Sequence, residues 1–281
     1  MTARVPDALD DEIAAVLGDG SLGVEVAPAG PGSSVLRVYQ SSLAEAKDAV
    51  ARARGVLAAH GLDDPDLRLA IDDVTDERWV ERWQASLAPI PLGRRFVVSP
   101  GGLAAAQEGR ETIRLTPGMA FGTGEHETTQ MCAAAVEALV VPGARWLDLG
   151  TGTGLLAVVA ARCGAARVLA VDLDPEAAAV AADVVSANGA AAVVEVRAGS
   201  IGDLAGETFD GIAANIQVSF FLAHAAALVG ALADGGVLVA SGFLEDDAAE
   251  VAAALSAAGV GLQSRWMKRP WVCLAARRGG G

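Results

Sequence analysis

Three glycines and one aspartate form the pattern with the clearest chemical meaning in this sequence. Gly150, Gly152 and Gly154 lie in a short segment that directly follows an apolar run ending at Leu149. Glycine adopts backbone angles that side chains forbid and lets a ligand approach the backbone closely. Asp172 ends the next apolar run, roughly 20 residues further on, where a carboxylate can accept hydrogen bonds from both ribose hydroxyls. The pattern therefore predicts a nucleoside-binding site.

The spacing of these glycines separates two classes of nucleoside cofactor. The dinucleotide fingerprint requires a glycine three residues after Gly152, and this chain has Leu155 there. A nicotinamide dehydrogenase is therefore disfavoured. The segment instead has the form G-x-G-x-G with Asp148 before it, which is typical of methyltransferases that use S-adenosylmethionine. We expect that cofactor to lie against Gly150 and Gly152, with Asp172 at its ribose.

The segments around this pattern alternate between apolar strands and helices. Strands are predicted at 145–149, 168–172, 193–197, 210–214 and 237–241, and helices at 154–163, 176–187, 217–233 and 246–258. Such alternation indicates a parallel sheet covered on both faces. A last pair of strands, 262–266 and 271–276, is joined only by residues 267–270 and must be a hairpin. The predicted fold class is α/β, a Rossmann-like class I methyltransferase sheet with an antiparallel C-terminal hairpin.

The pattern of residues 1–75 predicts a small α+β domain before this sheet. The pattern indicates a helix at 7–17, strands at 22–27 and 35–39, a helix capped by Ser41 or Ser42, and a strand at 67–74. No convincing strand pattern precedes Leu22. We therefore expect an N-terminal domain that is smaller than a complete α+β fold.

Residues 76–116 are expected to connect this domain to the methyltransferase domain, 117–281. Prolines at 89, 91 and 100 and the glycine pair at 101–102 interrupt regular structure. Trp79 and Trp83, four residues apart, share one face if they are helical. Anchoring the domains is the favoured role for these large aromatic side chains, and lining a cleft is the alternative.

A second glycine-rich segment, residues 116–129, directly precedes the helix before the first strand. Its sequence is TPGMAFGTGEHETT. One interpretation is a connector in which Thr128 or Thr129 caps the following helix. The other is a loop that closes over the cofactor. Composition alone leaves both open.

The form P-G-M-A-F-G-T-G-x-H-x-T-T, from Pro117 to Thr129, resembles the signature of the PrmA family, methyltransferases that modify large-subunit ribosomal protein L11. The resemblance extends over residues 75–277 and includes positions 76, 79, 83 and 89, then 148–154, 172–175, 188–189, 214–216, 235–236 and 241–242. It implies N-methylation of lysine side chains or of the N-terminal amine of that basic protein, with S-adenosylmethionine as methyl donor.

The resemblance also assigns cofactor-binding residues. It implies that Thr129 contacts S-adenosylmethionine, that Gly150 does so through its backbone, and that Asp172 holds the ribose. Asn215 would face the methionyl end and the acceptor. From its position alone, at the end of the fourth predicted strand, Asn215 is equally well a turn residue or a site residue.

Three further residues are placed by the same resemblance. Phe121 and Gly122 belong to the loop expected over the cofactor, and Ser200 is a weaker candidate near the adenine. His126 is interpreted as a residue that orders the loop rather than as a general base, because a base requires a geometry that spacing does not supply. The catalytic base is left unassigned.

The chain departs from the family pattern in the region expected to recognise substrate. Family members begin with a strand that completes a ferredoxin-like domain, which we do not find here. Gln84 replaces a basic residue, and Gly101-Gly102 replaces a tryptophan. The alternative is thus a related methyltransferase acting on a different protein, peptide or small molecule. A catalytically silent binding module would not need both the glycine segment and Asp172.

Charge and composition restrict the partners. The chain has 281 residues and a net charge of −14, so it lacks the basic footprint of a nucleic-acid-binding protein and suits a basic protein partner. Cys132, Cys163 and Cys273 match no metal-ligand spacing and are expected to be buried thiols, and no metal site is predicted. The acidic N-terminus is unlike a signal peptide, and no apolar run could span a bilayer. We expect a cytoplasmic protein without a membrane partner.

Overall fold

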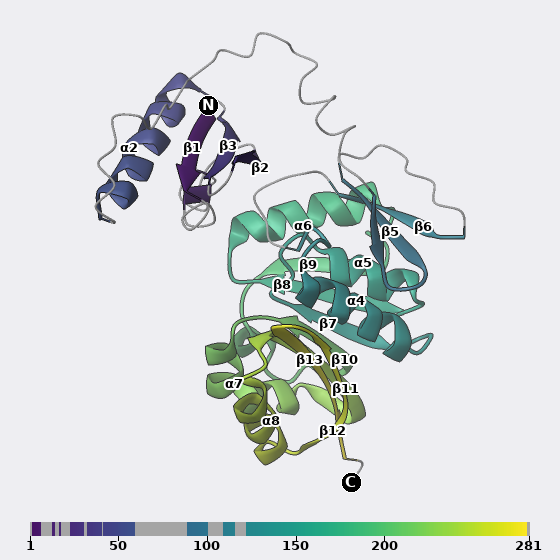
Figure 1. Cartoon of the computed structure of the whole chain (residues 1–281). Helices are drawn as coiled ribbons and strands as arrows, with labels where there is room; N and C mark the ends of the chain where they lie inside the picture. The colour runs from purple at the N-terminus through teal and green to yellow at the C-terminus, as the bar shows by residue number, and fades with distance from the viewer. Residues whose placement is uncertain are drawn as a thin grey trace. The chain divides into compact units, whose positions relative to one another are not determined.

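The computed structural model describes residues 2–6, 13–14, 17, 23–30, 33–40, 42–59, 89–100, 109–115 and 122–279. Contacts divide the chain into two compact units. The first comprises residues 1–82 with 117–119, and the second comprises residues 83–116 with 120–281. Figure 1 shows the first unit as a small sheet with a helix, and the second as a larger sheet surrounded by helices.

The first unit contains a three-stranded antiparallel sheet. Its strands are β1 (Thr2–Pro6), β2 (Gly23–Gly30) and β3 (Ser33–Tyr39), in the order β1-β3-β2. The expectation that no strand precedes Leu22 is therefore wrong. The short sequence of β1 carries little local signal, and β1 is extended because it pairs with β3 along its whole length. A local pattern does not contain that long-range pairing.

The helix α2 (Leu43–Ala59) forms the second layer of this unit. Ser42, one of the two predicted caps, accepts a hydrogen bond at Oγ from the backbone N–H of Glu45 at 3.2 Å. The core of this unit lies between α2, the helical residues 13, 14 and 17, and alternate positions of β3. It contains Ile13, Leu17, Leu36, Val38, Ala49 and Ala53. The strand predicted at 67–74 lies outside the described residues.

Residues predicted to be an irregular connector form a second small sheet. Its strands are β4 (Ile90–Leu92), β5 (Phe96–Pro100) and β6 (Glu111–Leu115), with β4 antiparallel and β6 parallel to β5. The prediction of interrupted structure is wrong here because Pro91 lies in the edge strand β4 and Pro100 ends β5, where a missing N–H is tolerated. Trp79, Trp83 and the glycine pair at 101–102 lie outside the described residues.

A seven-stranded sheet forms the centre of the second unit, in the order β12-β13-β11-β10-β7-β8-β9. Its parallel strands are β7 (Arg145–Leu149), β8 (Arg167–Asp172), β9 (Val194–Ala198), β10 (Phe209–Asn215) and β11 (Leu232–Leu244). The closing pair is β12 (Val260–Lys268) and β13 (Trp271–Arg278), and β13 runs antiparallel to both β11 and β12. The predicted α/β sheet with an antiparallel closing hairpin is confirmed.

Helices cover both faces of this sheet (Figure 1). One face carries α4 (Glu127–Leu139), α5 (Leu155–Arg162) and α6 (Pro175–Ala187), and the other carries α7 (Val218–Gly230) and α8 (Ala248–Ala257). Successive residues of a strand point to opposite faces, so Trp146 of β7 enters the first core and Leu147 enters the second. Because both cores are apolar, the strands are continuous apolar runs in the sequence.

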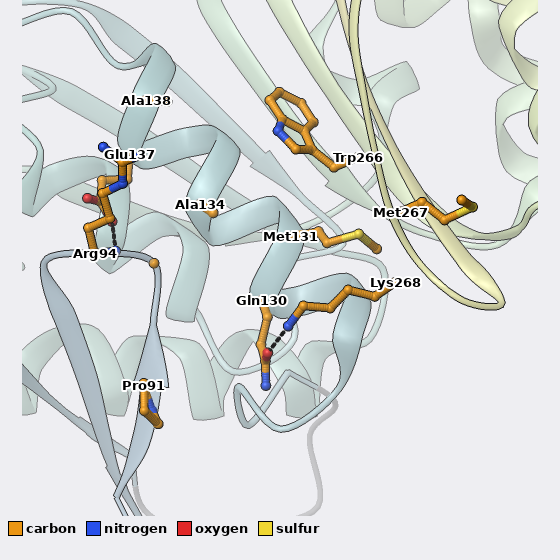
Figure 2. Close-up of a pocket in the computed structure, with 11 residues that line it drawn as sticks. Pro91, Arg94, Gln130, Met131, Ala134, Glu137, Ala138, Trp266, Met267 and Lys268 are labelled. Carbon is orange, nitrogen blue, oxygen red and sulfur yellow. Dashed lines mark hydrogen bonds between the residues drawn. The ribbon is translucent and has the colours of Figure 1, made fainter.

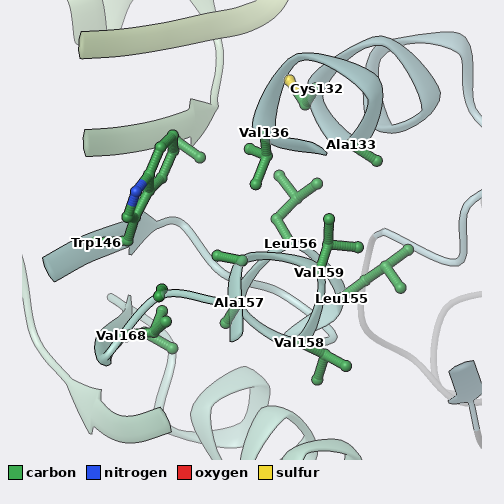
Figure 3. Close-up of a cluster of buried hydrophobic side chains, with 14 of the residues drawn as sticks. Cys132, Ala133, Val136, Trp146, Leu155, Leu156, Ala157, Val158, Val159 and Val168 are labelled. Atoms are coloured by element: carbon green, nitrogen blue, oxygen red, sulfur yellow. The ribbon is translucent and has the colours of Figure 1, made fainter. Parts of the chain in front are cut away.

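The core beneath α4 and α5 is built around Trp146. Figure 3 shows side chains from both helices gathered near the strand that carries its indole ring. Gly211 of the neighbouring strand β10 lies opposite Trp146, and a Cβ on Gly211 would lie 2.3 Å from the ring. Glycine at position 211 therefore leaves the indole its space and sets the register between β7 and β10.

The strand order brings the predicted site residues together at the carboxyl ends of the parallel strands. The chain runs outward from β7 through β8 to β9, and then returns to the other side of β7 to form β10 and β11. Ligands of open α/β sheets bind at such a reversal, at the carboxyl ends of the strands. Leu149, Asp172 and Asn215 end the three central strands β7, β8 and β10.

Candidate cofactor-binding site

The glycine turn, residues 150–154, connects β7 to α5 and is held against the end of β8. The backbone N–H groups of Gly150 and Thr151 both donate to the carbonyl of Val171, at 2.8 and 3.0 Å. Gly150 has a φ of +67°, and a Cβ there would lie 2.8 Å from the side chain of Ile216. A side chain at this position is therefore excluded by backbone conformation and by space.

Asp172 is fixed beside this turn. Its Oδ2 accepts a hydrogen bond from the backbone N–H of Gly152 at 2.8 Å, and its Oδ1 accepts one from the N–H of Asp174 at 3.1 Å. Each carboxylate oxygen can accept a further hydrogen bond. The structure thus brings Asp172 to the glycine turn, in a half-buried position at the end of β8.

Asp148, near the end of β7, stabilises the glycine turn through hydrogen bonds. Its carboxylate is buried, and Oδ2 accepts hydrogen bonds from Thr151 Oγ1 at 2.6 Å and from the backbone N–H of Ala157 at 3.0 Å. Burial raises the pKa of Asp148 to about 7, the two hydrogen bonds oppose this rise, and the charge of Asp172 adds to it. Asp148 therefore links Thr151 of the glycine turn to Ala157 in the first turn of α5.

The motif loop, defined here as residues 122–126, lies against the glycine turn. The carbonyl of Gly122 accepts a hydrogen bond from Thr153 Oγ1 at 2.8 Å. The predicted site residue Gly122 is therefore beside the turn that carries Gly150 and Gly152. Phe121, which was assigned to the same loop, lies outside the described residues.

The start of α4 differs from the expectation. His126 is the N-cap, and its Nδ1 accepts a hydrogen bond from the backbone N–H of Thr128 at 3.3 Å and lies 2.7 Å from Thr128 Oγ1. The interpretation of Thr128 or Thr129 as the cap is wrong, because an imidazole nitrogen accepts the hydrogen bond in their place. Both threonines are instead buried in the first turn of the helix.

Thr129 contacts Asn215 at the carboxyl end of β10, the strand next to the one that leads into the glycine turn. Asn215 Nδ2 donates to Thr129 Oγ1 at 3.4 Å, although the two residues come from β10 and α4. Among the described residues, Asn215 Oδ1 is the one buried side-chain polar atom without a hydrogen-bond partner. An unsatisfied buried acceptor costs about 1–3 kcal/mol, so a ligand that offers an N–H or O–H donor to this oxygen would be bound more tightly.

Ser200 lies at the same sheet edge, after β9, but its side chain is already engaged. It is the N-cap of the short 3-10 helix Ile201–Leu204. Its Oγ and its backbone N–H both donate to Asp203 Oδ2 at 2.8 Å. A contact between Ser200 and the adenine remains a prediction.

Two residues that shape the site were missed as site residues. Ile216 follows Asn215 and fills the space against Gly150. Gly242 has a φ of +95°, and a Cβ there would lie 2.4 Å from the carbonyl oxygen of Ile216. The only signal for them was the place of 214–216 and 241–242 in the family resemblance, because their contact joins segments that are distant in the chain.

The cysteines differ in burial. Cys132 and Cys273 are buried as predicted, but Cys163 is only half-buried, so the prediction of a buried thiol is wrong for Cys163. A hydrogen bond with Cys273 and burial raise the pKa of the Cys132 thiol well above its usual range. In the described part of the chain, no group of three or more His, Cys, Asp or Glu side chains could hold a metal ion. Nor does any helix among the described residues have the length and hydropathy needed to cross a membrane.

Comparison with known proteins identifies relatives over most of the chain. A family model described as ribosomal protein L11 methyltransferase (PrmA) matches residues 24–279. The ribosomal protein L11 methyltransferase of Pelotomaculum thermopropionicum is 45% identical over 205 residues, which cover 73% of this chain and 67% of that protein. The protein of the same name from Chloroflexus aurantiacus is 37% identical over 230 residues, which cover 73% of this chain and 70% of that protein.

A solved structure shares the fold. The ribosomal protein L11 methylase from Lactobacillus delbrueckii subsp. bulgaricus superposes with a TM-score of 0.62 and 29% identity, and the match covers 69% of this chain and 100% of that one. The predicted Rossmann-like methyltransferase fold and the predicted enzyme class agree with this likeness. The chain therefore belongs to the PrmA family of ribosomal protein L11 methyltransferases, enzymes that use S-adenosylmethionine.

Proposed function

We propose that this chain transfers methyl groups from S-adenosylmethionine to amino groups of ribosomal protein L11, on lysine side chains or at the N-terminus. One observation carries the proposal. The carboxyl edge of the sheet brings a fixed carboxylate, Asp172, and the unpaired amide oxygen of Asn215 to opposite sides of one glycine turn. The first suits a nucleoside, and the second suits an N–H donor.

The residues present fit the methyl donor. Asp172 offers acceptors for the ribose hydroxyls, and the backbone of Gly150 and Gly152 lies beside them. We assign Phe121 and Gly122 to the cover of the cofactor and Ser200 to the adenine side. When bound, S-adenosylmethionine supplies a methyl group activated by its sulfonium, so the protein contributes mainly position and orientation.

Thr129 and Asn215 are assigned to the methionyl end and the acceptor. An amine that donates one N–H to Asn215 Oδ1 satisfies the buried oxygen and leaves its nitrogen lone pair free to attack. In the transfer, the bond between the amine nitrogen and the methyl carbon would form as the bond between that carbon and the sulfonium sulfur breaks. The electron pair of the broken bond would return to sulfur, and the methylated ammonium would release its proton to solvent. Asn215 would therefore orient the nucleophile.

The acceptor must be neutral when it reacts. A free lysine side chain has a pKa of about 10.4, and burial of the amine on binding lowers it. We assign no general base. His126 Nδ1 is engaged with Thr128, which supports the role of His126 in ordering the loop.

Charge supports a protein substrate. The net charge of −14 gives a field that attracts a basic protein and repels nucleic acid. Family members begin with a strand in the N-terminal domain, and its expected absence weakened the prediction of the substrate. The strand β1 supplies such a strand. We assign the N-terminal unit to substrate recognition.

The test is methyl transfer between purified components. The chain is incubated with labelled S-adenosylmethionine and purified ribosomal protein L11, and mass spectrometry locates the label. We expect label on amino groups of the protein and none on a control sample whose amino groups have been acetylated. A chain that binds the cofactor but leaves L11 unlabelled would contradict this substrate and favour a different protein, peptide or small molecule.

A further inference from the structure

The motif loop depends on contacts from outside itself. Gly122 and Gly124 have positive φ angles of 106° and 93°. Glycine loses more conformational freedom on ordering than any other residue, so a loop built on it is costly to fix. The loop leads into the helical turn that carries Thr129, and its shape therefore affects the position of that residue.

The first external contact comes from the last strand of the sheet. Trp271, the first residue of β13, lies edge-to-face against His126, with ring centroids 4.7 Å apart and an interplanar angle of 67°. His126 is also the N-cap of α4. The indole therefore restrains the ring whose nitrogen begins the helix.

The second contact passes through Gln130. Its Nε2 donates to the carbonyl oxygens of Gly124 and Glu125, at 3.1 and 3.0 Å. Its Oε1 accepts a hydrogen bond from Lys268 Nζ, at the end of β12, as Figure 2 shows. An ammonium group can only donate, so Lys268 holds the amide oxygen and leaves the amide N–H groups directed at the loop.

These contacts are confined to one end of the β12–β13 hairpin. The hairpin and α4 also border a groove of about 790 Å³, which begins at Gln130 and Lys268 and is lined further by Met131, Ala134, Glu137, Trp266 and Met267 (Figure 2). Trp266 and Trp271 are both half-buried and both pack against the same core. They differ in that Trp266 lines the groove while Trp271 contacts His126.

We propose that Trp271 and Lys268 are positioning residues: the end of the β12–β13 hairpin holds the motif loop in its binding shape through His126 and Gln130, and so sets the affinity for the cofactor. This inference rests on the proposed function. It assigns the hairpin a role in binding although neither side chain needs to touch the cofactor.

The test compares Trp271→Leu with the matched control Trp266→Leu in the full chain. Calorimetry measures the affinity for S-adenosylhomocysteine, and amide hydrogen exchange without ligand measures protection at residues 122–126. Trp271→Leu is expected to weaken binding about 3- to 10-fold, the loss of one aromatic pair, and to speed exchange in the loop. Trp266→Leu removes a similar ring and should change the affinity less than twofold.

Two further variants test the contact through His126 and the contact through Gln130 separately. His126→Asn keeps a side chain that caps helices but loses the ring, so it should match Trp271→Leu, and the double variant should be no worse than either single one. Lys268→Met should weaken binding about twofold by releasing the amide of Gln130. In methyl transfer, these changes should raise KM for the methyl donor by a larger factor than they lower kcat.

Equal affinity losses in Trp271→Leu and Trp266→Leu would overturn the inference, because both would then act through general packing. Unchanged loop exchange in Trp271→Leu would overturn it as well. If the wild-type chain fails to bind S-adenosylhomocysteine, the proposed function is wrong. The exchange measurement needs no ligand, so it still decides whether the hairpin orders the loop.

Discussion

The two sides of the glycine turn are built differently. On the side of β7 and β8, Asp148 and Asp172 both accept hydrogen bonds from the protein, at 2.6 to 3.1 Å. On the side of β10, Asn215 holds Thr129 by one long hydrogen bond of 3.4 Å, and its buried oxygen has no partner. We call the first the nucleoside side and the second the transfer side, after the roles that we propose for them. The carboxylates of the nucleoside side are held by donors from the protein, whereas the transfer side has a buried acceptor whose donor would come from a ligand.

This difference corresponds to two demands of methyl transfer. A nucleoside is bound in the same way before and after reaction, so a rigid site whose carboxylates are fixed by protein donors serves it. The reacting amine must be held in one orientation, and an acceptor that is buried and unsatisfied favours the state in which an N–H is present. The comparison predicts that changes on the first side affect binding and stability, and that changes on the second affect rate.

The largest expected effect is on the stability of the nucleoside side. The pKa of Asp148 is about 7 in the fold and 3.8 as its ordinary value, so the folded chain holds this proton between about pH 4 and pH 7 while the unfolded chain releases it. The free energy of unfolding therefore falls as pH rises through this range. Asp148→Asn removes the titrating group and therefore this pH dependence. Its free energy of unfolding, relative to that of the wild type, should rise by roughly 2–4 kcal/mol from pH 5 to pH 8.

Urea unfolding of the wild type and of Asp148→Asn at both pH values measures this difference. Asp183→Asn, at an exposed position of α6, serves as the control and should follow the wild type. A difference between Asp148→Asn and the wild type that stays constant from pH 5 to pH 8 would contradict the protonation of buried Asp148.

The next effect concerns the transfer side. Asn215→Ala removes the unpaired acceptor and should lower kcat by about 100-fold or more, because the amine loses its orienting contact. The affinity for S-adenosylmethionine should fall much less. Steady-state transfer to L11 gives kcat, and a variant whose KM for the methyl donor rises while kcat is preserved would place Asn215 with the nucleoside side instead.

A smaller effect tests the space beside the turn. Gly150→Ala places a Cβ at positive φ and 2.8 Å from Ile216, which should cost about 1–2 kcal/mol in cofactor binding. The second substitution Ile216→Ala removes the steric part, and the double variant should recover some affinity in calorimetry. If the double variant binds no better than Gly150→Ala, the contact with Ile216 is not what requires glycine.

The smallest effect is expected at Ser200. Its hydroxyl donates to Asp203, so Ser200→Ala should cost about 0.5–1 kcal/mol of stability through the lost cap. Cofactor affinity should change less than about threefold, since a hydroxyl already engaged adds little to a ligand. A tenfold loss in a calorimetric titration would show that Ser200 contacts the adenine directly.

The nucleoside side was largely predictable because its signal is local. The glycine spacing and Asp172 follow one another within a single strand–turn–helix–strand unit, and the fold brings them together through the ordinary parallel pairing of β7 and β8. The alternation of apolar strands and helices likewise predicted the main sheet and its closing hairpin. Local chemistry and global fold agree in this region.

The transfer side could not be derived in the same way. Thr129 and Asn215 are 86 positions apart, and only the completed sheet makes them neighbours. His126 was overlooked as a cap because preferences for threonine are statistical, whereas the ring nitrogen is placed by Trp271 as well. The strands β1 and β4–β6 were missed because pairing partners, not local patterns, decide whether such short segments are extended.

The most direct test of the comparison is a calorimetric titration of S-adenosylmethionine into the wild type, Asp172→Ala and Asn215→Ala. We expect one binding site in the wild type, a loss of about 1–3 kcal/mol in Asp172→Ala because ribose hydroxyls lose a charged acceptor, and a much smaller loss in Asn215→Ala. No binding to the wild type would favour a silent module on this fold. Equal affinity in Asp172→Ala and the wild type would contradict the assignment of Asp172 to the ribose.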